Sequence, residues 1–187
     1  MALLILGLIL WTAAHLLGVM APARRADLDA RFGKGPARGL MAVVILLSVA
    51  LMVIGYQRAE FIEVWQPPAF LTHLNNLLML VAIFLFVAGR FPSVVRRKIR
   101  HPQLTAAKTW AFAHLAVNGD LASIVLFGGI LAWAVLSVIA TNRRDGARGN
   151  LPEATGQGLV VHIAVALIVF SVVAWVHIWV GVWPFAG

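Results

Sequence analysis

Long apolar runs separated by short polar segments dominate the pattern of hydrophobic and polar positions along the chain. A bilayer core of about 30 Å takes roughly 20 helical residues, and five of the runs approach or exceed that length. They cover residues 3–21, 40–56, 70–88, 121–140 and 159–182. The pattern predicts membrane-spanning helices and leaves no room for a separate soluble domain, so we expect residues 1–187 to form one domain.

A sixth run, residues 103–118, is shorter and carries Lys108. It is a crossing, a re-entrant segment or the start of one long helix. If it crosses and the chain turns at residues 118–120, then 14 of the 15 Lys and Arg residues lie on one side of the membrane. Without that turn, 11 of these residues lie on one side and 4 on the other. The positive-inside rule therefore favours an all-α bundle of six transmembrane helices, with both termini on the non-cytoplasmic side.

In this topology the polar segments on the membrane side that holds most of the Lys and Arg residues are predicted to be loops. They cover residues 22–39, 89–103 and 141–158. In the turn at residues 118–120, Asp120 is placed to cap the helix that follows. Small residues in the first and fifth helices, Gly7, Gly18, Gly128 and Gly129, are expected to let helices approach closely. Trp183 and Phe185 are expected in an aromatic belt at the outer interface.

Composition agrees with a membrane protein, since 61% of the residues are hydrophobic and 12% are charged. The formal net charge of +8 comes from basic blocks between apolar runs and not from one soluble face. The expected partner is therefore the lipid bilayer and not nucleic acid. The chain has no cysteine, so any metal chemistry must rest on His and carboxylates.

Most ionisable side chains in the predicted helices are His. An ionisable group inside a membrane marks a functional site by default. At 1.5 Å rise per residue the His side chains fall into two layers. The cytoplasmic half holds His15, His101 and His162, and the outer half holds His73, His114 and His177. Each His can instead stabilise the packing of two helices through one interhelical hydrogen bond. As a set they suit haem, whose iron takes neutral imidazole, better than zinc, because an H-E-x-x-H pattern is absent.

One stripe in the sixth run concentrates these groups. Trp110, His114 and Asn118 repeat every four residues and therefore share a helix face. Lys108 points away from it, and its long stem can reach back to the cytoplasmic surface. His114 is thus the group in this segment that needs a ligand or a partner.

Several stretches resemble the NnrU family of bacterial integral membrane proteins. They include "LGLILWTAAHLLGVMAPARRADL" near the start and "RHPQLTAAKTWAFAHLAVNGDLASIVLFGGILAWAV" from residue 100. The resemblance covers nearly the whole chain. It implies the bacterial inner (cytoplasmic) membrane and an association with denitrification, in nitrite and nitric oxide metabolism. The family is also similar to the plant 15-cis-zeta-carotene isomerase, a membrane enzyme that uses haem b with His ligation.

Carried onto this chain, the family's recurring His positions fall on His15, His101 and His114. His15 resembles the haem ligand in the early helix of the isomerase, whereas the isomerase's second ligand matches no His here. The resemblance implies haem b as the cofactor. We take His15 and His114 as the candidate metal ligands, and matching depth makes His177 and His162 the alternates. The full predicted cofactor site consists of His15, His101, His114, Asn118, Arg24 and Arg25. In it the two Arg side chains would pair with haem propionates.

Two hypotheses follow. The first is a haem-binding membrane protein that serves denitrification or the isomerisation of an apolar isoprenoid or carotenoid-like substrate. The second is a non-catalytic membrane factor for assembly or transport, in which the His side chains pack helices or form a proton path. The sequence does not decide whether the protein is an enzyme, and it assigns no catalytic residue.

Overall fold

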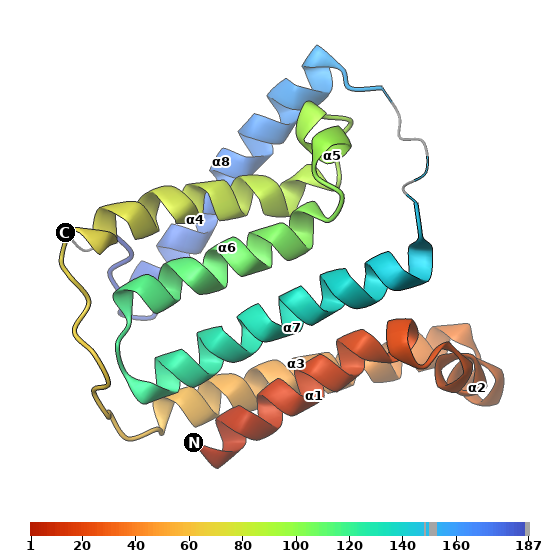
Figure 1. The fold of residues 1–187 in the computed structure, drawn as a ribbon, viewed down its shortest axis with the longest axis horizontal. Helices are drawn as coiled ribbons and strands as arrows, with labels where there is room; N and C mark the ends of the chain where they lie inside the picture. Colours follow the sequence, from red (N-terminus) through yellow and green to blue (C-terminus); the bar gives the residue numbers. More distant parts are fainter. Residues whose placement is uncertain (148, 150–152, 186–187) are drawn as a thin grey trace. The chain divides into compact units, whose positions relative to one another are not determined.

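A computed structural model describes residues 1–147, 149 and 153–185, and these fold into helices (Figure 1). Arg148 and residues 150–152 of the predicted linker lie outside the described residues. The described part of the chain contains eight helices. They are α1 (Ala2–Met20), α2 (Pro22–Phe32), α3 (Lys34–Gln57), α4 (Leu71–Ala88), α5 (Val94–Lys98), α6 (Pro102–Val117), α7 (Leu121–Asp145) and α8 (Gly156–Trp179).

Five of these helices, α1, α3, α4, α7 and α8, are long and apolar enough to cross a membrane. Their outward faces carry many exposed Leu, Ile and Val side chains, as a lipid-facing helix requires. The chain is therefore an all-α, multi-pass membrane protein. The sixth predicted crossing is the 16-residue helix α6, and its crossing and the sidedness of the termini stay predictions.

The prediction of loops at 22–39 and 89–103 was wrong in part, because α2 and α5 lie within them and α3 begins at Lys34. Helix α2 starts with Pro22 in its first turn, where the missing N–H costs nothing. Its Arg25 and Asp29 pair at 3.0 Å one turn apart. A largely polar segment, none of whose residues is buried, thus still forms a helix.

The chain divides into two compact units, and neither is continuous in sequence. Unit 1 contains Met1–Trp65 and Asp120–Gly146, and unit 2 contains Gln66–Gly119 and Ala147–Gly187. Unit 1 therefore holds the long helices α1, α3 and α7, and unit 2 holds α4, α6 and α8. The expected single domain over residues 1–187 stays a prediction, and the units are described separately.

Glycine sets the close packing of α1 against α3 in unit 1. A Cβ on Gly7 would lie 2.7 Å from the carbonyl oxygen of Ser48, and one on Gly55 would lie 2.8 Å from Cα of Leu4. Gly129 of α7 faces the side chain of Leu8. The predicted close approach is confirmed at Gly7 and Gly129, whereas nothing lies within 4 Å of a Cβ on Gly18 or Gly128.

A series of side-chain hydrogen bonds connects the end of α3 to the start of α7. The Tyr56 hydroxyl lies 2.8 Å from Ser123 Oγ, and Ser123 Oγ donates to Asp120 Oδ2 at 2.5 Å. The other carboxylate oxygen of Asp120 accepts the backbone N–H of Ser123 at 2.9 Å. Asp120 is therefore the N-cap of α7, as the sequence predicts.

In unit 2, His162 links α8 to α4. Its ring is fully buried, lies flat against Phe84 with 4.1 Å between ring centroids, and donates from Nε2 to the Phe84 carbonyl at 2.7 Å. Nearby, the backbone N–H of Thr155 donates to the carbonyl of Pro92 at 3.0 Å. These bonds fix the first turns of α8 against the end of α4.

Candidate functional site

The stripe on α6 is held in place by bonds within its own helix. Nδ1 of His114 donates to the carbonyl of Trp110 at 2.9 Å, and the Asn118 side-chain amide donates to the carbonyl of His114 at 2.8 Å. Neutral imidazole carries one N–H, so a donor at Nδ1 makes Nε2 the acceptor. The last turn of α6 therefore presents His114 in one tautomer.

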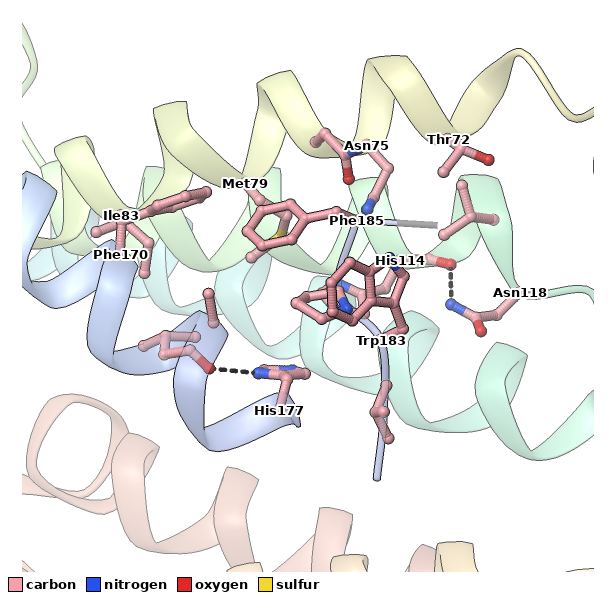
Figure 2. Close-up of a pocket in the computed structure, with 16 residues that line it drawn as sticks. Thr72, Asn75, Met79, Ile83, His114, Asn118, Phe170, His177, Trp183 and Phe185 are labelled. Carbon is pink, nitrogen blue, oxygen red and sulfur yellow. Dashed lines mark hydrogen bonds between the residues drawn. The ribbon is translucent and has the colours of Figure 1, made fainter. Parts of the chain in front are cut away.

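Beside this stripe lies a cavity of about 280 Å³, formed within unit 2 by α4, α6, α8 and the segment after α8. His114 and His177 both line it (Figure 2). Nδ1 of His177 donates to the carbonyl of Val173 at 2.8 Å, an arrangement that matches His114. The structure thus brings together two imidazoles that the sequence places at similar depth.

The cavity wall on α4 carries amides and a hydroxyl. Figure 2 shows Thr72, Asn75 and Met79 extending from α4 towards the cavity, and Asn76 also lines it. Oδ1 of Asn75 is buried, and no described residue donates to it. Sequence reasoning missed these residues, although amides inside an apolar run are a signal that a helix faces something polar.

The chain segment that follows α8 forms the outer wall. Gly181 adopts φ +85°, a left-handed conformation that glycine takes without strain, and the N–H of Val182 turns back to the carbonyl of His177 at 2.8 Å. Trp183 and Phe185 then line the cavity, while 63% and 41% of their surfaces stay exposed. We call residues 181–185 the tail.

The remaining predicted site residues lie elsewhere. His101 is the N-cap residue of α6, and its carbonyl accepts the Thr105 N–H at 2.9 Å. His15, Arg24 and Arg25 belong to unit 1, where Arg25 is paired with Asp29. The pair His15 and His114 is divided between the units, and its ligation of iron stays a prediction.

The contacts of His162 favour the packing role that the sequence left open for each imidazole. Its Nε2 donates to the backbone carbonyl of Phe84, and the ring of Phe91 also stacks with the imidazole, with 5.8 Å between centroids. His73, by contrast, is exposed on α4 and does not line the cavity. Only His114 and His177, of the six His, line this cavity.

The five long apolar helices define a polytopic helical membrane protein, and its unit 2 contains a cavity lined by two imidazoles. The chain matches the family described as NnrU protein over residues 3–184, and it belongs to that family. No curated protein matches it, and no solved structure does.

Proposed function

We propose that this NnrU protein binds haem b in the cavity of unit 2, with Nε2 of His114 as an iron ligand and His177 as the second imidazole. The supporting observation is that both rings line one cavity and both donate from Nδ1 to a backbone carbonyl. A metal-ligating His almost always makes such a bond, because it fixes the tautomer and the ring orientation.

The donor set fits haem. Neutral imidazole is a common axial ligand of haem iron, and apolar helices provide the walls. Among the described residues there is no group of three His, Cys, Asp or Glu side chains that could hold a metal, so a porphyrin that supplies four ligands suits two imidazoles better than a bare ion does. Bound haem would supply a Lewis-acidic, one-electron iron centre.

The cavity of unit 2 is too small to hold haem without a movement of one wall. A cavity of about 280 Å³ lies at the lower end for small-molecule sites, so a macrocycle needs one wall to withdraw. The tail is the wall that can do so, because most of the Trp183 side chain is already exposed. Withdrawal of the tail around Gly181 therefore accompanies haem binding in this proposal.

The chain's own residues then orient ligand and substrate. His114 and His177 are held by their helices, and Met79 and Phe170 contribute apolar side chains to the cavity wall. Asn75, with its unpaired buried Oδ1, offers an acceptor to a donor group on a substrate. An apolar substrate of isoprenoid type would enter from the bilayer, and this arrangement suits its isomerisation as well as a role in nitrite and nitric oxide metabolism.

We further propose the bacterial inner membrane as the location, with α6 as a sixth crossing and both termini on the non-cytoplasmic side. The distribution of 14 of 15 basic residues on one side supports this topology. Because the chain has no cysteine, single Cys residues placed at the exposed positions Gly39 and Glu60 can be labelled in intact cells. An impermeant maleimide should label the second and not the first, and the reverse result would reject the topology.

Haem binding is tested by the visible spectrum of the detergent-purified protein. We expect a Soret band that is lost or shifted in His114→Ala and His177→Ala and retained in the matched control His73→Ala. A colourless, folded protein from haem-replete cells would reject haem. A band lost in His15→Ala and His114→Ala but retained in His177→Ala would instead assign the iron to the first pair and reject His177.

A further inference from the structure

A second cluster of aromatic and polar side chains lies in unit 1, on the faces where α1 and α7 meet. Trp11 and His15 come from α1, and their ring centroids are 4.0 Å apart. Trp133 of α7 meets both edge-on, at 5.2 Å from Trp11 and 5.0 Å from His15. Ser137 lies one helical turn after Trp133, on the same side of α7.

The polar atoms of this cluster lack partners. Nε1 of Trp11, Nε1 of Trp133 and Oγ of Ser137 are buried, and no described residue bonds to them. Trp133 and Ser137 are only 8% and 6% exposed. A buried donor without an acceptor is destabilising, and native proteins supply a partner for nearly all of them. Three such atoms occur on two adjoining helices, and each of them needs a partner.

The chemistry of that partner follows from the donors. An indole N–H can only donate, so the partner must carry acceptor atoms. No charged residue occurs in Ala2–Met20 or in the first 22 residues of α7, up to Asn142, and an anion without a nearby cation is costly inside a membrane. The acceptor is therefore neutral, and a carbonyl oxygen is the simplest neutral group that only accepts.

The rings define the rest of the ligand. Two indoles and an imidazole in edge-on and tilted contact provide faces and edges on which a flat apolar ring stacks. His15 donates from Nδ1 to the Trp11 carbonyl at 2.9 Å, so its Nε2 is an acceptor. That acceptor suits the hydroxyl of the reduced form of such a compound.

We propose that unit 1 binds a lipid-soluble carbonyl compound with a flat ring, the chemistry of a quinone head group, through the indole N–H groups of Trp11 and Trp133 and the hydroxyl of Ser137. The bilayer supplies this ligand. The site is separate from the imidazole cavity of unit 2 in its residues and in the kind of ligand that it takes.

The probe is a decyl-substituted benzoquinone, with an azido derivative for photolabelling of the full-length protein in detergent. Label should appear in peptides from α1 and α7, and unlabelled quinone should compete. Trp133→Phe keeps the ring and removes the N–H, and Ser137→Ala removes the hydroxyl. Each should raise the dissociation constant by about 3- to 10-fold, the effect of one hydrogen bond to a neutral group.

Trp175→Phe is the matched control, because Trp175 is 63% exposed on α8 and has no part in this cluster. It should leave the dissociation constant unchanged. Decylbenzene, which has the tail and ring but no carbonyl, should fail to compete. Equal competition by decylbenzene, or unchanged binding in both Trp133→Phe and Ser137→Ala, would overturn the proposal. The Soret band is measured separately, so the haem proposal and this one fail on different results.

Discussion

Replacing Gly55 by alanine tests whether α1 and α3 are packed backbone against backbone. A Cβ at this position would lie 2.8 Å from Leu4 Cα and 2.9 Å from the carbonyl carbon of Leu3. Both are main-chain atoms of α1, so no rotamer change can relieve the clash. The backbone nitrogen of Leu4 lies closer still, and ordinary van der Waals contact begins near 3.4 Å, so α1 must move away from α3 by well over about 0.6 Å (3.4 less 2.8).

The cost follows from that displacement. Overpacking a well-filled core costs about 1–3 kcal/mol, and we expect about 3 kcal/mol here because the backbone itself obstructs the new methyl group. For a chain of this length each kcal/mol lowers the melting temperature by about 2–4 °C. Gly55→Ala should therefore melt about 6–12 °C below the wild type, as followed by far-UV circular dichroism in detergent.

The matched control is Gly39→Ala on the same helix, where nothing lies within 4 Å of the added Cβ. Alanine is favoured over glycine inside a helix by about 1 kcal/mol, so this variant should melt at or slightly above the wild-type temperature. If the two variants melt within about 1 °C of each other, α1 and α3 are not in backbone contact at Gly55 and the packing argument fails.

Two further substitutions test single hydrogen bonds. Tyr56→Phe removes the hydroxyl that reaches Ser123 Oγ and should lower the free energy of unfolding by about 0.5–1.5 kcal/mol, measured by thermal melting; no change would show that the bond between α3 and α7 does not stabilise the protein. His162→Leu removes the side-chain donor to the Phe84 carbonyl and should lower the free energy of unfolding by about 0.5–1.5 kcal/mol. His162→Ala removes the ring without replacing its volume, and if it melts no lower than His162→Leu, the filling of this buried site beside Phe84 contributes nothing.

The sequence predicts the long helices well because bilayer thickness sets their length. The runs at 3–21, 70–88 and 103–118 agree with α1, α4 and α6 to within one residue at each end. The prediction failed at α2, a short and largely polar helix with no buried residue. Its Arg25–Asp29 pair can be recognised only if a helix is already assumed.

The site was predictable only in part for a related reason. Periodicity places Trp110, His114 and Asn118 on one stripe, and depth along a helix matches His114 with His177. Neither periodicity nor depth reveals how each helix is rotated about its own axis. The rotation of α4 brings Asn75 to the cavity wall. The turn of the tail at Gly181 depends on one positive φ angle, and an interfacial role for Trp183 follows equally well from its position in the sequence.

The interleaving of the two units has a consequence for biogenesis. The chain leaves unit 1 after Trp65 and returns to it at Asp120, so α1 and α3 emerge from the ribosome well before α7. During that interval residues 66–119 are inserted into the membrane, while α1 and α3 are already present without α7. The close contacts at Gly7 and Gly55 involve α1 and α3 alone, so they can form before α7 arrives. Trp133, which arrives with α7, can complete the aromatic cluster of unit 1 only after most of unit 2 has been translated.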